Sequence, residues 1–98
     1  MEITKEEGES KGRLVAMQDD LELGEMTYSL ANDGNLWIVD HTGVHEGHGI
    51  KGVGKALFFD LVKRLREEGK KVMPLCSFTR AMFEKNKDTW DVLRHNSL

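Results

Sequence analysis

A glycine-rich segment in the middle of the chain constrains its fold more than any other feature. Four apolar residues (36–39) lead into this segment, and a helical pattern (52–68) follows it. Between them, residues 47–54 contain four glycines, and lysines lie at 51 and 55. A strand, a glycine loop and a helix in this order leave backbone N–H groups free at the positive end of a helix dipole. We therefore predict that the loop binds a phosphate-bearing ligand.

The composition predicts one small domain, residues 1–98, of a soluble and cytoplasmic protein. Apolar residues make up 39% of the chain, enough for one core but not for two lobes. The net charge is −3 and no basic stripe is present, so we expect no nucleic-acid partner. We expect no membrane partner, because no apolar run approaches the roughly 18 residues of a span and the acidic N-terminus lacks a signal-peptide core. A lone cysteine, Cys76, excludes an internal disulfide, and we expect a monomer or a weak homodimer.

The first half of the chain predicts three strands in an antiparallel meander. Residues 13–17 are mostly apolar, and residues 24–30 alternate between apolar and polar, which is typical of a half-exposed strand. Asn32-Asp33-Gly34 predicts a hairpin turn, after which a third strand covers residues 36–42. Residues 1–11 are charged and aperiodic, and they form either a frayed end or a short edge strand.

The second half predicts a helix and a further strand. Apolar residues recur at helical spacing up to residue 68, and Gly69 is placed to end this helix in the left-handed conformation. Residues 71–75 predict a short strand. Strand, helix and strand then form a βαβ unit, whose two strands are parallel through a right-handed crossover. The prediction is an α/β fold with a mixed sheet of the α+β kind, an antiparallel meander followed by a βαβ unit.

A C-terminal helix is expected over residues 78–86. Ser77 precedes it as the cap, and Phe78, Met82 and Phe83 are expected to be buried. The tail beyond this helix carries one large apolar anchor, Trp90.

Two phosphate-binding motifs match the loop only in part. Residues 47–52 read G-x-G-x-x-G, but a dinucleotide fold also needs an acidic residue after the next strand and a second βαβ half. Residues 49–56 match a P-loop except at Ala56, where a magnesium-binding hydroxyl is required. We therefore reject both interpretations of the loop, as a dinucleotide-binding motif and as a P-loop.

The loop does resemble the acetyl-coenzyme A loop of the GNAT N-acetyltransferases. The matching residues are Gly49-x-x-Gly52-x-Gly54, with Gly49 where that family usually has Gln or Arg. Two flanking motifs resemble the short single-domain GNAT-like proteins of bacteria and plants: Ile38-Val39-Asp40-His41-Thr42-x-Val44 and Val72-x-Pro74-x-Cys76-x-Phe78. The resemblance spans about residues 24–93 and implies a minimal GNAT-like fold.

That resemblance implies transfer of an acetyl group from acetyl-coenzyme A to an amine, on a small molecule or a peptide. The pantetheine arm of the cofactor is then expected along the strand before the loop, at Val39, His41, Thr42 and Val44. The diphosphate is expected at Gly49, Ile50, Lys51, Gly52, Val53, Gly54 and Lys55. Arg80 is a weaker candidate for the same contact.

Cys76 and His41 are the candidate catalytic residues. The two parallel strands end near them, and ligands collect beyond the carboxyl ends of parallel strands, so both side chains are expected at one mouth. A thiol before a helix has its thiolate favoured by the dipole. Cys76 then acts as a general base, a general acid or an acyl acceptor, or it is only a small buried residue. His41 either assists Cys76 or forms a hydrogen bond with the backbone.

Two other functions stay open at this stage. A chain of 98 residues lacks the extra elements that enclose an acceptor, which suits a non-catalytic acetyl-coenzyme A or coenzyme A binding module or subunit. A purely structural protein would use the glycines only for packing. His41, His45 and His48 have irregular spacing and no partner ligands, so we predict no metal site.

Overall fold

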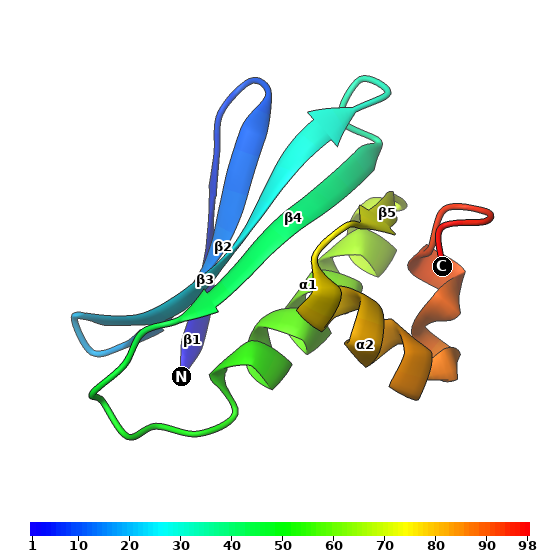
Figure 1. The fold of residues 1–98 in the computed structure, drawn as a ribbon. Helices are drawn as coiled ribbons and strands as arrows, with labels where there is room; N and C mark the ends of the chain where they lie inside the picture. Colours follow the sequence, from blue (N-terminus) through cyan, green and yellow to red (C-terminus); the bar gives the residue numbers. More distant parts are fainter.

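A five-stranded sheet in the order β1-β2-β3-β4-β5 frames the molecule in a computed structural model that describes residues 1–98 (Figure 1). The strands are β1 (Glu2–Glu7), β2 (Lys11–Gln18), β3 (Leu21–Ala31), β4 (Leu36–Val44) and β5 (Lys71–Pro74). The first four are antiparallel, and β5 is parallel to β4. The predicted meander and the parallel pair are confirmed. The first residues of the chain form an edge strand paired with β2, which decides between the two expectations for them.

The turn between β3 and β4 is the predicted hairpin. Asn32 and Asp33 have φ of 50° and 57°, and Gly34 has φ of 84°. Positive φ at both central residues gives the backbone twist that a tight hairpin needs, and Asn, Asp and Gly tolerate it best.

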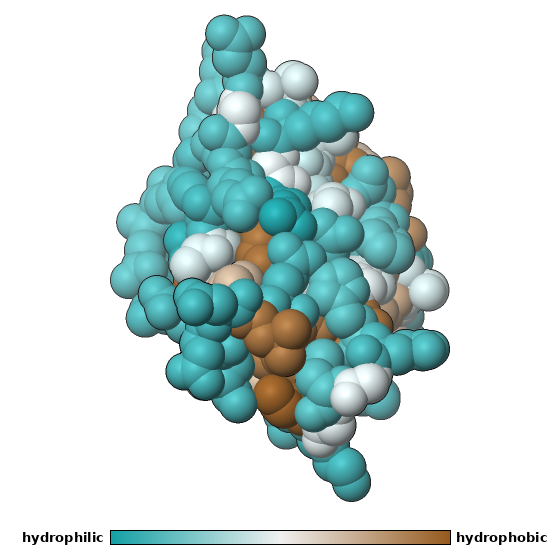
Figure 2. All heavy atoms as spheres, turned by 90° about the vertical axis from the view of Figure 1, so that its left-hand side faces the viewer, coloured by the Kyte–Doolittle hydropathy of each residue, from teal (hydrophilic) through white to brown (hydrophobic).

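The helices α1 (Val53–Glu68) and α2 (Ser77–Lys85) lie on the same side of the sheet, followed by the 3₁₀ helix η1 (Lys87–Val92) (Figure 1). Gly69 ends α1 with φ of 68°, as the sequence predicts. The side of the molecule away from α2, drawn in Figure 2, is mostly hydrophilic around a small apolar patch. The sheet therefore has one face under helices and one face without them.

The core fills the space between the sheet and α1. Tyr28 and Trp37 stack with ring centroids 4.0 Å apart, and Phe58 packs edge-on against Phe83 of α2. Gly12 lies directly under the Tyr28 ring, where a Cβ would come within 2.5 Å of ring atoms. The apolar residues of β2, β3 and β4 that alternate inward thus meet the apolar stripe of α1.

Three details at the start of α2 and beyond differ from the prediction. The residue that caps the helix is Cys76, so Ser77 is already its first residue. Phe83 is buried, but Phe78 and Met82 are only half-buried because α2 covers the edge of the core. Trp90 is 43% exposed, and the buried residues of this segment are Thr89 and Val92.

Candidate active site

The site begins where β4 and β5 separate. Their last pair joins Val39 to Pro74, and the Val39 carbonyl then accepts hydrogen bonds from the N–H groups of Leu75 (2.8 Å) and Cys76 (3.1 Å). Beyond this point β4 continues through residues 40–44, which pair with β3 on one side and have no strand on the side of β5. A free strand edge therefore faces the start of α2.

A β-bulge occurs at the same level. Thr27 pairs with His41 and Tyr28 pairs with Val39, so Asp40 is an extra residue without a partner on β3. The Thr27 hydroxyl donates a 2.6 Å hydrogen bond to the Asp40 carboxylate. A bulge bends its strand and shifts the alternation of side chains that follow.

The glycine loop connects the end of β4 to α1, at the lower left of Figure 1. Gly47, Gly49 and Gly52 all have positive φ, and Gly52 caps α1 with no side-chain hydrogen bond. The first helical hydrogen bond is made by Ala56 N–H, which donates to the Gly52 carbonyl. The N–H groups of residues 51–55 donate to no protein atom. Five amides at the positive end of α1 are therefore available to an anion.

The side chain of His48 holds this loop to the sheet. Its Nε2 is 3.1 Å from the Leu23 carbonyl oxygen, and its Nδ1 is 2.9 Å from Ile50 N. A carbonyl only accepts and an amide N–H only donates, so the ring is the neutral tautomer with its proton on Nε2. Sequence reasoning considered His48 only as a metal ligand, since its partners are brought together by the fold.

Gly52 and Gly54 have different reasons to be glycine. A Cβ at Gly54 would lie 2.8 Å from the ring of Phe78, so this glycine allows α1 to approach α2. A Cβ at Gly52 would meet nothing within 4 Å, but its φ is 80°. Gly54 is thus a packing residue, whereas Gly52 is required by the backbone conformation of the loop.

Cys76 lies at the inner side of the free edge. It is 8% exposed, and its Sγ donates to Thr42 Oγ1 at 3.5 Å. Thr42 Oγ1 is in turn 3.5 Å from Thr79 Oγ1, which is fully buried. Burial raises the pKa of the thiol, but hydrogen bonds from Thr42, Thr79 and the Phe78 backbone outweigh it and leave the pKa below its ordinary value.

His41 does not lie beside Cys76. It precedes Thr42 in an extended strand, and its Nε2 is 2.9 Å from the position of a Cβ on Gly43, so it shares the outer face with residue 43. The expectation that His41 and Cys76 share one mouth is corrected, because the bulge at Asp40 turns Thr42 inward and His41 outward.

The basic residues near the loop divide into free and engaged ones. Lys51 and Lys55 are exposed and form no ion pair. Arg80 donates to the carbonyls of Pro74 (3.4 Å) and Ser97 (3.3 Å), which directs it to the C-terminal segment. Only the two lysines are therefore free to meet a phosphate.

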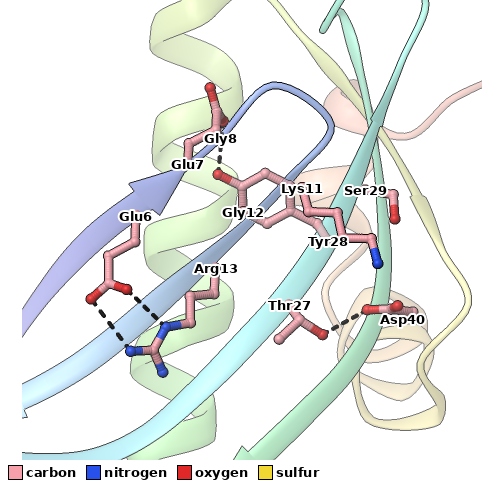
Figure 3. Close-up of a pocket in the computed structure, with 10 residues that line it drawn as sticks. All are labelled: Glu6, Glu7, Gly8, Lys11, Gly12, Arg13, Thr27, Tyr28, Ser29 and Asp40. Atoms are coloured by element: carbon pink, nitrogen blue, oxygen red, sulfur yellow. Dashed lines mark hydrogen bonds and ion pairs between the residues drawn. The ribbon is translucent and has the colours of Figure 1, made fainter.

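The largest hollow of the molecule, about 610 Å³, lies away from the loop, over the sheet near the β1–β2 hairpin (Figure 3). None of the three hollows is lined by residues 47–55, so the free amides face an open surface. No group of three or more histidine, cysteine or acidic side chains is placed to hold a metal ion. Neither α-helix combines the length and the apolar character that crossing a bilayer requires.

A family model and solved structures of known proteins match this chain, and they agree on the family. A family model described as GCN5-related N-acetyl-transferase matches residues 13–93. The NMR structure of a GCN5-like protein from Staphylococcus aureus is 35% identical, with a TM-score of 0.62, over 95% of this chain and 92% of that one. No curated protein matches the sequence.

Two larger proteins share the fold. A ribosomal-protein-alanine N-acetyltransferase from Brucella melitensis is 25% identical with a TM-score of 0.64, and the alignment covers 80% of this chain and 62% of that one. An aminoglycoside N-acetyltransferase solved in complex with CoA is 12% identical with a TM-score of 0.51, over 93% of this chain and 72% of that one. The latter likeness concerns the fold alone.

Proposed function

Because the chain belongs to the GCN5-related N-acetyltransferase family, we propose that it transfers an acetyl group from acetyl-coenzyme A to an amine. The observation that carries the proposal is the row of unpaired amides at residues 51–55, beside the free edge of β4. Amides at a helix N-terminus suit a diphosphate, which has the opposite charge and many acceptor oxygens.

The residues of the loop would contribute to cofactor binding in different ways. Lys51, Gly52, Val53, Gly54 and Lys55 offer free N–H groups, and the two lysines add positive charge. Ile50 offers no amide, because its N–H already donates to His48. Gly49 supplies the positive φ, 69°, that turns the chain into the loop.

The free edge of β4 would hold the pantetheine arm. The Val39 carbonyl is already used by two amides after β5, so the pairing begins beyond it. His41, Thr42 and Val44 remain as backbone partners on the edge of β4 that β5 does not cover. An extended amide-containing arm fits there as an added strand would.

Acetyl-coenzyme A supplies a thioester, whose C–S bond breaks as the amine nitrogen forms the new C–N bond and one proton passes from nitrogen to sulfur. Cys76 would handle that proton, and the position of its Sγ next to Thr42, at the inner side of the free edge, supports this role. A thiol whose pKa lies below its ordinary value ionises more readily, and it can accept and return a proton. Thr42 would stabilise the thiolate by donating its hydroxyl proton.

One observation favours a second function, a module that binds coenzyme A without turnover. Cys76 is only 8% exposed, and no hollow surrounds the loop. For turnover to occur despite this, an amine would have to reach the thioester from the outer face of the sheet, or a partner protein would have to complete the acceptor site.

Measurements of cofactor binding and of turnover together separate these functions. We expect coenzyme A at about 100 times its dissociation constant to stabilise the domain by about 2.7 kcal/mol, visible as a thermal shift. We expect thiol release from acetyl-coenzyme A with a panel of amines, and about a 100-fold lower kcat in Cys76→Ala. Binding without turnover for every amine would favour the module, and an absent thermal shift would exclude both.

Thr42→Val tests the role given to the hydroxyl beside Cys76. We expect the pKa of the thiol to rise, so that thiolate absorbance, which reports this single cysteine, appears at a higher pH than in the wild type. A lowered native pKa makes the wild type gain stability, relative to the variant, as pH rises from the native to the unfolded pKa. Thr4→Val, on the edge strand, is the control and should leave the titration unchanged.

A further inference from the structure

The largest hollow has a polar wall on the outer face of the sheet. Glu6, Lys11, Arg13, Thr27 and Asp40 line it, together with parts of the β1–β2 hairpin (Figure 3). These residues alternate with the inward residues of β2, β3 and β4, so their side chains lie on the face without helices. At about 610 Å³ the hollow has the size of a small-molecule site.

Carboxylates dominate the charge of this hollow. Arg13 is fully engaged, since it contacts Glu6 at 3.0 Å, Glu22 at 3.1 Å and Glu25 at 3.0 Å. Three carboxylates around one guanidinium leave a net negative charge next to the hollow. Asp40 adds another carboxylate that meets no cation; one of its oxygens accepts from Thr27, and the other is unused. Lys11 is the one cation of the wall without a carboxylate partner.

The hollow also reaches the point where β4 parts from β5. Asp40 is the bulge residue, directly after the last residue of β4 that pairs with β5. On the inner side of this point Cys76, Thr79 and Val53 are buried and leave no space for an acceptor. Since no strand covers the edge of β4 beyond Val39, a group bound along it is open to the outer face.

We propose that this hollow is the acceptor site, and that it takes an alkylamine carrying a second positive charge, with Asp40 as a binding residue. The inference rests on the proposed function, because it takes the thioester to lie along the free edge of β4. An ammonium group against Asp40 satisfies the unused carboxylate oxygen, and the surrounding carboxylates favour a dication over a zwitterion. Lys11 opposes such a ligand.

Three four-carbon amines provide the test: putrescine, butylamine and γ-aminobutyrate. We expect kcat/KM to fall in that order for the wild type. Asp40→Asn keeps an oxygen for the Thr27 hydroxyl but removes the charge, and we expect it to reduce the preference for putrescine over γ-aminobutyrate about tenfold. Lys11→Gln should increase that preference. Asp33→Asn, in the hairpin turn, is the matched control and should change neither value.

Binding measurements keep this inference separate from the proposed function. We expect putrescine to bind in the presence of coenzyme A, as measured by calorimetry, and to bind about tenfold more weakly to Asp40→Asn, while coenzyme A itself binds both proteins equally. If putrescine binds, and binds more weakly to Asp40→Asn, but is not acetylated, the proposed acceptor site is supported and the proposed acetyl transfer is contradicted. Equal putrescine affinity in Asp40→Asn, or a preference for γ-aminobutyrate, would overturn the acceptor site while leaving the cofactor site intact.

Discussion

Two glycine-containing turns of this molecule share a backbone conformation with positive φ but differ in whether their N–H groups form hydrogen bonds. In the hairpin between β3 and β4, Gly34 N–H donates to the Ala31 carbonyl at 3.0 Å and Asn35 N–H donates to the Asn32 carbonyl at 3.1 Å. In the loop before α1, three glycines also have positive φ, but the amides of residues 51–55, which lead into and form the first turn of the helix, have no partners. Positive φ is thus common to both turns, and they differ in whether their N–H groups have partners.

The strongest test of this comparison substitutes one glycine in each turn. Gly52 and Gly34 have φ of 80° and 84°, and a Cβ on either would meet nothing within 4 Å. We expect Gly52→Ala and Gly34→Ala to lower the free energy of unfolding by similar amounts, about 1–2 kcal/mol, since an L-residue is strained there. Coenzyme A affinity should fall at least tenfold in Gly52→Ala alone, because the amides move.

Calorimetry of coenzyme A binding, with thermal unfolding of each variant alone, measures both quantities. Equal affinity in the two variants would mean that the loop is only a connection, as the hairpin is.

A smaller effect is expected when the loop loses its anchor. His48→Ala removes the side chain that bonds both the Leu23 carbonyl and the Ile50 amide. We expect about a fivefold loss of coenzyme A affinity, corresponding to about 1 kcal/mol for ordering the loop. His95→Ala near the C-terminus, where His95 forms no side-chain hydrogen bond, is the control. An unchanged affinity in His48→Ala would show that the loop keeps its shape through its glycines.

The smallest effect concerns the lysines of the loop. Lys51→Gln and Lys55→Gln each remove an exposed charge, so we expect about a twofold to threefold loss of affinity and a weaker dependence on salt. Lys63→Gln, exposed further along α1, should leave both unchanged. A far larger loss of coenzyme A affinity would show that the lysine side chains, and not the backbone amides, contribute most to binding.

Sequence reasoning succeeded where the determining contacts are local. The Asn32-Asp33-Gly34 turn and the end of α1 at Gly69 follow from residue type and spacing. The pairing of β4 with β5 is not local, but it follows from the order of strand, helix and strand. Sequence reasoning failed at the faces of β4, because the extra residue at Asp40 depends on pairing with β3. The role of His48 and the outer hollow depend on contacts between distant segments in the same way.

The bulge at Asp40 lets β4 carry one residue more than the stretch of β3 it pairs with. If Asp40 were removed, Val39, His41 and Thr42 would pair with Tyr28, Thr27 and Met26 in regular alternation, so His41 would stay on the outer face and Thr42 on the inner one. A deletion of Asp40 would therefore remove the outer carboxylate and leave the contact between Cys76 and Thr42 in place. Laboratory evolution that samples deletions, and not only substitutions, could therefore alter the outer face of this strand in a single step without changing its inner face.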